Sequence, residues 1–230
     1  MKDPYVYEGS SILINLKDIR DQKKLDEYEN AMTSLAIMKL QKDGMEVNSL
    51  NDVFAVHKML FEKVYSWAGE PRQINIYKEE PVLSGLSVEY CDYKKIRQEI
   101  KKLDKEFVSL DWKKLSKKKL VSNTAFYFTF LWKIHPFREG NTRTVSTMMS
   151  LYAKKIGLKL DVDFVAEHVK YFRNAMVLNS IGEYAEPEHL EEFLSDALLI
   201  RNPKDSTEKY KTINGYEVEK YRYAQHSSKD

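Results

Sequence analysis

The chain has 230 residues, and its 37 Lys or Arg against 35 Asp or Glu give a formal net charge of +2. A charge this small excludes a global electrostatic field that would draw the chain to nucleic acid or to an anionic membrane. The sequence has only 8 Gly and 6 Pro, too few turn-formers for the many hairpins of an all-β protein. Long helices in one domain with an appended tail are therefore expected.

Cysteine usage and the lack of long apolar segments predict the location of the protein. Cys91 is the single cysteine, so the sequence allows neither an intramolecular disulfide nor a multi-thiolate zinc site and fits a reducing compartment. No secretory apolar core follows Met1, and no stretch of about 18 uninterrupted apolar residues occurs. The expected location is the cytoplasm, with no membrane partner, and export by a system that reads other signals stays open.

The N-terminal third predicts an extended arm followed by two helices. Residues 5–15 are aromatic and β-branched with a Gly-Ser-Ser break, which favours an extended arm. Apolar residues at helical spacing predict a first helix over residues 18–40. Asn51 is the expected N-cap of a second helix, whose apolar stripe reaches Trp67 and is stopped by Gly69.

The middle of the chain carries one strand signal and then further helices. Residues 72–78 alternate polar and apolar side chains at period two, which predicts a short strand or hairpin arm on the surface. An amphipathic helix is expected over residues 93–110, and the densely apolar stretch 117–134 predicts a buried central helix. The last expected helices cover residues 142–156, 163–179 and 187–200.

These elements suggest three parts: an N-terminal arm and helix at residues 1–49, a core domain at 50–202 and a C-terminal tail at 203–230. In the tail, Asn214-Gly215 favours a small hairpin between residues 210–213 and 216–218. We expect the tail to be peripheral or to face a partner. The basic runs between residues 94 and 119 are broken by acids, so they predict a solvated surface rather than a nucleic-acid site.

The loop between the central helix and the next one, residues 135–143, carries the clearest functional signal. Pro136 disfavours helix at the preceding residue, and Gly140 permits a positive φ, so the loop turns sharply before a new helix starts. A helix N-terminus behind a glycine is an anion-binding site. Arg143, one turn into that helix, is able to pair with phosphate oxygens.

Two further side chains of the loop complete a set of groups for phosphorus chemistry. His135 is able to accept a proton at neutral pH, and Glu139 is a hard oxygen ligand of the kind that Mg²⁺ takes beside substrate phosphates. A base, a metal carboxylate and a phosphate cradle together predict transfer of a phosphorus-containing group from a nucleotide to a hydroxyl. The alternatives are a structural role for His135 and an ordinary ion pair between Glu139 and Arg143.

The loop resembles the signature H-P-F-x-x-G-N-G-R-x-x-R of Fic domain proteins, members of the Fido superfamily, most of which transfer AMP from ATP to a hydroxyl of a target protein. Upstream, residues 57–69 and 72–76 resemble the helix and the β-hairpin flap that precede this signature, and the similarity covers roughly residues 50–200. The resemblance implies an all-α Fic fold, a helical bundle with one short β-hairpin flap. His57 itself is expected to be a satisfied core histidine.

The resemblance also implies roles for individual residues. His135 would be the general base, and Glu139 would hold Mg²⁺. Asn141 and the Gly140 backbone would contact the α-phosphate, and Arg143 the β-phosphate, while Phe137 anchors the loop. The full nucleotide-binding set is Arg138, Gly140, Asn141, Thr142, Arg143 and Ser146. The flap that would pair with the target backbone is Ile74, Asn75, Ile76, Tyr77 and Lys78.

Two positions depart from the signature, which has Gly at Thr142 and Arg at Ser146. The second arginine of the family pairs with the γ-phosphate or with an inhibitory glutamate, from a motif of Ser or Thr, three residues, then Glu and Gly or Asn. Glu29-Asn30 follows Leu25 instead of Ser or Thr, and no other Glu-Gly or Glu-Asn pair completes that motif. The sequence therefore predicts no restraint in cis by the usual device.

The activity implied is Mg²⁺-dependent transfer of AMP from ATP to a Tyr, Ser or Thr hydroxyl of a target protein, with release of pyrophosphate. A separate antitoxin or regulator is a further candidate partner. A first alternative keeps the fold and transfers phosphate or phosphocholine, which the loss of a γ-phosphate contact at Ser146 favours. A second alternative is a catalytically degenerate binding module that acts through its flap and tail.

Overall fold

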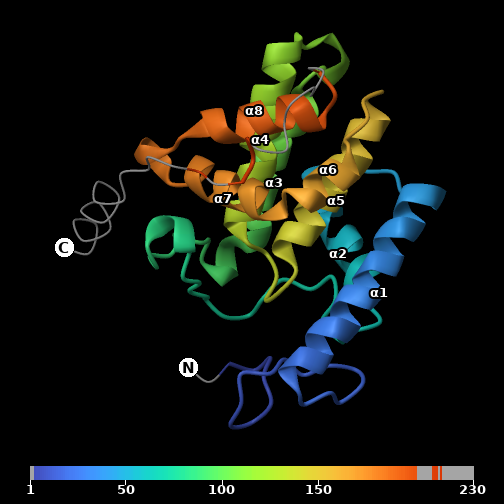
Figure 1. Cartoon of the computed structure of the whole chain (residues 1–230), viewed down its shortest axis with the longest axis vertical. Helices are drawn as coiled ribbons and strands as arrows, with labels where there is room; N and C mark the ends of the chain where they lie inside the picture. The colour runs from blue at the N-terminus through green and yellow to red at the C-terminus, as the bar shows by residue number, and fades with distance from the viewer. Residues whose placement is uncertain (1–2, 201–208, 212, 214–230) are drawn as a thin grey trace.

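The computed structural model describes residues 3–200, 209–211 and 213. Within these ranges the chain folds into eight α-helices and five short 3₁₀ turns, which confirms the all-α class (Figure 1). The helices are α1 Gln22–Asp43, α2 Val53–Phe61, α3 Ile96–Ser109, α4 Lys117–Ile134, α5 Asn141–Lys155, α6 Val162–Glu167, α7 Val169–Asn179 and α8 Pro187–Ala197. The 3₁₀ turns are η1 Leu50–Asp52, η2 Pro81–Leu83, η3 Tyr93–Lys95, η4 Trp112–Lys114 and η5 Gly182–Tyr184. Among the described helices, none combines the length and the apolarity needed to cross a bilayer.

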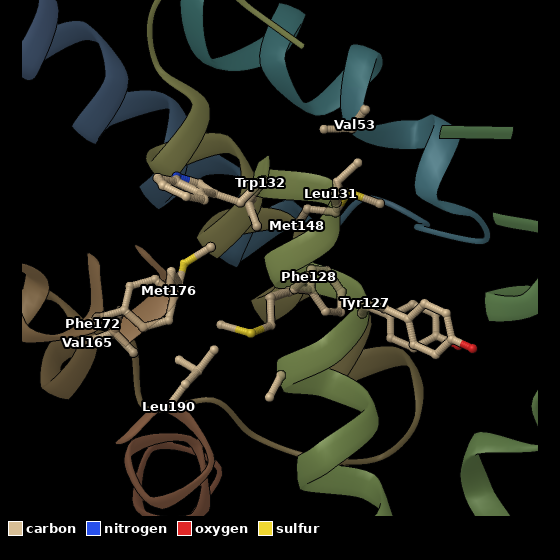
Figure 2. Packing of buried hydrophobic residues seen from close by; sticks show 14 of the residues in the cluster. Val53, Tyr127, Phe128, Leu131, Trp132, Met148, Val165, Phe172, Met176 and Leu190 are labelled. Atoms are coloured by element: carbon tan, nitrogen blue, oxygen red, sulfur yellow. The ribbon is translucent and has the colours of Figure 1, made fainter. Parts of the chain in front are cut away.

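Helix α4 is the centre of the bundle and has the predicted bounds. The Ser116 hydroxyl accepts the N–H of Lys119 and caps its first turn. The helix ends at Ile134 because His135 adopts a left-handed φ of 51° and a proline follows. Its buried side chains contact α3, α5, α7 and α8. Figure 2 shows Phe128, Leu131 and Trp132 of α4 among Met148 of α5 and Phe172 and Met176 of α7.

The N-terminal helices form with different ends from those expected. The Asp21 side chain caps α1, which runs to Asp43 and stops at Gly44, where φ is 78°. Asn51 is not the N-cap of the second helix, because its side chain donates to Asp104 at 2.8 Å. A 3₁₀ turn, in which the Asp52 carboxylate accepts the N–H of Ser49 at 2.9 Å, precedes α2 instead. Helix α2 ends at Phe61, well before Trp67.

The strand predicted over residues 72–78 does not form, so the flap is a segment without regular secondary structure, bent at residues 73–74, and not a β-hairpin. Side chains elsewhere bind backbone groups at both ends of this segment. The N–H of Gln73 donates to the Tyr5 hydroxyl at 3.0 Å, and the N–H of Lys78 donates to the Ser87 hydroxyl at 3.3 Å. In the described residues, the one β-bridge joins Val6 and Leu13 of the N-terminal arm.

The C-terminal half also differs from the prediction in two places. The single helix expected over residues 163–179 is two helices, because the backbone breaks at His168 with φ −109° and ψ 26°. In the tail, Tyr210 is only 2% exposed and its hydroxyl donates to Asp196 of α8 at 2.5 Å, so this one residue packs on the core, and the expectation for the rest of the tail stays a prediction. Most of the predicted tail hairpin, including residues 216–218, lies outside the described residues.

Candidate active site

His135 is held in one orientation at the end of α4. Its Nδ1 lies 3.2 Å from the Trp132 carbonyl oxygen and donates to it, which leaves the lone pair of the neutral ring on Nε2. Nε2 is buried and has no hydrogen-bond partner among the described residues. The Tyr90 ring lies over the imidazole, with a centroid distance of 4.1 Å. The geometry therefore presents Nε2 as a proton acceptor in a nearly water-free position.

The electrostatic environment keeps His135 neutral. Burial lowers the pKa of His135 well below its usual value, and the Lys78 cation lowers it further. The Arg72 and Arg173 guanidinium groups act in the same direction. A neutral imidazole is the form that accepts a proton from a hydroxyl.

Glu139 lies in the loop with both carboxylate oxygens engaged. Oε1 accepts the N–H of Gly140 at 2.9 Å, and Oε2 lies 3.3 Å from Nζ of Lys78. Burial by itself raises the pKa of Glu139, but Lys78, the Gly140 N–H and Arg143 together hold it below its ordinary value. The carboxylate is therefore ionised. No group of three or more His, Cys, Asp or Glu gathers as a metal cage in the part of the chain that is described. A single carboxylate fits Mg²⁺ that takes its other ligands from phosphates and water.

The N-terminus of α5 has the backbone features on which the predicted anion site depends. Gly140 precedes the helix with φ 81°, and no side chain caps the first turn. A Cβ on Gly140 would lie 2.2 Å from the Phe61 ring, so the loop packs directly on that ring. Thr142 does not cap the helix either, because its hydroxyl accepts the indole N–H of Trp132 at 3.0 Å. The free backbone N–H groups and the helix dipole favour an anion at this end.

Asn141 and Phe137 fix the shape of the loop from inside. The Asn141 carboxamide accepts the N–H of Phe137 at 3.0 Å and donates to its carbonyl at 2.8 Å. The Phe137 ring is fully buried and stacks on His57 with a centroid distance of 3.7 Å. Phe137 is thus the loop anchor that was expected. The side chain of Asn141 is used within the loop, so any phosphate contact of this residue in the present conformation falls to its backbone N–H.

Arg143 faces α1 rather than Glu139, so the alternative of a mutual ion pair is wrong. Its guanidinium pairs with Glu29 and also donates to the Thr33 hydroxyl at 3.1 Å. The Tyr65 hydroxyl donates to the other oxygen of Glu29. Phe61 lies under the guanidinium, 5.1 Å away. The position of Glu29 opposite Arg143 results from the packing of α1 against α5 and has no signal in the sequence.

The other two residues of the predicted nucleotide set have different surroundings. Arg138 pairs with Asp3 of the N-terminal arm at 2.9 Å. The Ser146 hydroxyl donates to the Arg143 carbonyl at 3.1 Å. Thr142, Arg143 and Ser146 line one side of a cavity of about 190 Å³ between α1, α5, α6 and α7. Their part in nucleotide binding stays a prediction.

Arg72 is a support of the site that the sequence did not indicate. It is 2% exposed, and its Nε donates to the His135 carbonyl at 2.8 Å while Nη1 donates to the Ile74 carbonyl at 2.6 Å. Its backbone N–H donates to the Pro136 carbonyl at 2.8 Å. One buried side chain therefore connects the flap to the loop at residues 135–143. No periodicity or motif signals this, because Arg72 occupies an apparently polar position of an alternating segment.

His57 is the satisfied core histidine that was expected, and it also supports the loop. Its Nδ1 accepts the N–H of Gly69 at 2.8 Å, and its Nε2 donates to the Glu139 carbonyl at 3.2 Å. Burial lowers the pKa of His57 from 6.5 to about 3, so the ring is neutral in the folded protein.

We expect the free energy of unfolding to fall as the pH drops from 7 to 5. Below about 6.5 the unfolded chain protonates His57 and His135 while the folded chain does not, so stability is lost at about 1.4 kcal/mol per pH unit for each residue. Urea unfolding at several pH values measures this slope. His57→Gln should flatten it, because this substitution removes one of the two buried groups that only the unfolded chain protonates. An equal slope in wild type and His57→Gln would contradict the assignment.

Known proteins match both the sequence and the fold. Residues 48–153 match the model of the Fic/DOC family. The probable protein adenylyltransferase y4lH of Sinorhizobium fredii is 29% identical over 80% of this chain and 92% of that protein. Protein adenylyltransferase VbhT of Bartonella schoenbuchensis is 28% identical over 89% of this chain but only 40% of that protein.

Among solved structures, the N-terminal Fic domain of Bep8 from Bartonella sp. 1-1C superposes with a TM-score of 0.71. It is 24% identical and covers 87% of this chain and 95% of that chain, which establishes a common fold. The match of the family model includes the loop at residues 135–143 and the helices α2, α4 and α5 on which the site is built. Residues 48–153 of this chain are therefore similar in sequence to the Fic/DOC family, and the chain shares its fold with a solved Fic domain.

Proposed function

We propose that this protein is an adenylyltransferase that moves AMP from ATP to a hydroxyl side chain of a target protein. The observation that carries the proposal is the pairing of an uncapped, glycine-led helix N-terminus with a neutral histidine whose Nε2 lone pair is unused among the described residues. The names of the curated relatives, protein adenylyltransferases, support the same reaction.

In this proposal each group has one task. Nε2 of His135 takes the proton of the target hydroxyl as its oxygen attacks the α-phosphorus, and the bond to pyrophosphate breaks. The backbone N–H groups at the start of α5 stabilise the charge on the α-phosphate, and Arg143 that on the leaving pyrophosphate. Mg²⁺, held by Glu139 and the phosphates, would neutralise charge on the nucleotide.

The flap would bind the target. Within the described residues, the backbone N–H and C=O groups of Asn75, Ile76 and Tyr77 make no hydrogen bond, and these residues belong to no helix or strand. A surface segment with free backbone groups is able to pair with a target strand, which would place a Tyr, Ser or Thr near His135. We propose residues 50–202 as the core domain, with 1–49 and 203–230 as its N-terminal and C-terminal additions. The single thiol, Cys91, supports action in a reducing compartment such as the cytoplasm.

Labelled ATP tests the proposal and separates it from its alternatives. The full chain is incubated with a target-containing lysate and Mg²⁺, in parallel with α-labelled and γ-labelled ATP. Retention of the α-label on protein supports AMP transfer. Retention of the γ-label supports phosphate transfer, the alternative that Ser146 favours. No label from either nucleotide contradicts the proposed activity.

Substitutions of Glu139 and of Lys78 should change the affinity for Mg²⁺ in opposite directions. Glu139→Gln removes the ligand charge, so the Mg²⁺ concentration for half-maximal labelling should rise. Lys78→Met removes the cation 3.3 Å from that carboxylate, so Mg²⁺ should bind more tightly, by up to about fivefold for a partly exposed ion pair. Calorimetric titration of Mg²⁺ into the ATP complex measures both. An unchanged Mg²⁺ affinity in Glu139→Gln would remove Glu139 from the metal site.

A further inference from the structure

A fully buried carboxylate lies in the loop that follows the flap. Glu80 has 0% exposure, and its oxygens accept both Nη atoms of Arg173 of α7, at 2.5 and 2.9 Å. The Tyr90 hydroxyl donates to the same carboxylate at 2.9 Å. A buried charge is costly without partners, and removing one partner leaves the other uncompensated, so these three side chains act as one unit.

Glu80 lies where the loop closes on itself. Its N–H donates to the Leu86 carbonyl at 3.0 Å, and its carbonyl accepts the N–H of Gly85 at 3.1 Å. The short helix η2 between them packs against α7, and Figure 1 shows this segment, in teal to green, beside α7. Lys78 and Tyr90, which contact Glu139 and His135 of the loop at residues 135–143, flank this closed turn. A shift of Glu80 would therefore move both of them.

Tyr90 connects the buried carboxylate to the proposed base. Its ring lies 4.1 Å from the His135 ring and 6.0 Å from Trp132, while its hydroxyl is fixed by Glu80. On its other side, the His135 ring is held by the Trp132 carbonyl through Nδ1. Two contacts thus hold the imidazole: a hydrogen bond to the end of α4, and the Tyr90 ring, whose position depends on Glu80.

We infer that Glu80 and Tyr90 are positioning residues for His135: Arg173 and Glu80 fix the Tyr90 hydroxyl, and the Tyr90 ring then holds the imidazole in the orientation that presents Nε2. The inference rests on the proposed role of His135 as the base. Neither residue belongs to the loop at 135–143, and neither touches the helix N-terminus that would bind phosphate. Their loss should slow the chemical step and leave nucleotide binding intact.

The test compares Tyr90→Phe, which keeps the ring and removes the hydroxyl that donates to Glu80, with Tyr210→Phe. The latter deletes a similar buried bond, from Tyr210 to Asp196 on α8, far along the chain from the loop. We expect Tyr90→Phe to lower kcat about 10- to 100-fold with an unchanged KM for ATP. It should also move the His135 Cε1–Hε1 signal in a ¹H–¹³C spectrum. Tyr210→Phe should lower the melting temperature and change neither readout.

If Glu80→Gln folds, it should reproduce the effects of Tyr90→Phe. If Glu80→Gln does not fold, Tyr90→Phe alone tests the inference. A folded Tyr90→Phe with the wild-type kcat and an unmoved His135 signal would overturn the inference. The spectrum also separates the positioning role from the proposed AMP transfer, because recording it requires no turnover. If the wild type transfers no AMP, a moved signal still supports the positioning role and an unmoved one refutes it.

Discussion

His135→Asn should reduce AMP transfer by about 10²–10⁴-fold, the usual loss when a general base is removed. Asparagine is the informative replacement because it tolerates the left-handed backbone of His135, where φ is 51°, better than alanine does. Binding of Mg·ATP should be retained, since the groups proposed to bind the phosphates belong to α5 and the loop glycine. Single-turnover labelling gives the rate, and calorimetry gives the affinity.

The same residue predicts the pH dependence of the wild type. Burial lowers the pKa of His135 well below its usual value, so the base stays unprotonated as the pH falls to 6.5 and beyond. The fall of kcat on the acid side of its pH profile should therefore occur below pH 6.5. Substantial turnover by the folded His135→Asn protein would show that another group takes the proton.

The sequence predicted those features that depend on neighbouring residues. Helix α4 has its predicted ends at Lys117 and Ile134 because a serine cap begins it and a His-Pro step ends it, and both signals are local. The left-handed Gly140 and the helix that starts after it follow from the same kind of signal. The backbone geometry on which the proposed anion site depends could be predicted for this reason.

The segment at residues 72–78 shows how a correct pattern led to a wrong element. Its side chains do alternate in exposure as period two requires, with Gln73, Asn75 and Tyr77 exposed and the residues between them more buried. Alternation reports an extended backbone on a surface, but a strand also needs a partner. Here Arg72 and the Tyr5 hydroxyl take the neighbouring backbone groups, so no ladder forms.

The charges that surround the site could not be predicted, because their partners are distant in sequence. Arg143 pairs with Glu29 across 114 positions, Arg72 reaches the His135 carbonyl across 63, and Arg173 pairs with Glu80 across 93. In a single sequence each of these side chains resembles an ordinary surface charge. These charged side chains come close to the site only because α1, the flap and α7 pack around the loop.

Gly140→Ala should be among the most destabilising single substitutions in the loop, at about 2–5 kcal/mol. An alanine at φ 81° costs about 1–2 kcal/mol, and its Cβ would meet the Phe61 ring at 2.2 Å, an overlap that adds about 1–3 kcal/mol. Because Phe61 is fully buried in α2, the loop has to move instead. That movement displaces the N–H groups at the start of α5, so Mg·ATP affinity should fall as well.

Gly157→Ala is the matched control, since Gly157 has nearly the same backbone, with φ 84°, and nothing within 4 Å of an added Cβ. It should cost only the backbone term of about 1–2 kcal/mol and leave ATP binding unchanged. Urea unfolding and calorimetry on both variants measure the difference. In a Phe61→Leu background the extra cost of Gly140→Ala should shrink toward that of Gly157→Ala, because the overlap is relieved. Equal costs for the two alanines in the wild-type background would show that the Phe61 contact does not set the position of the loop.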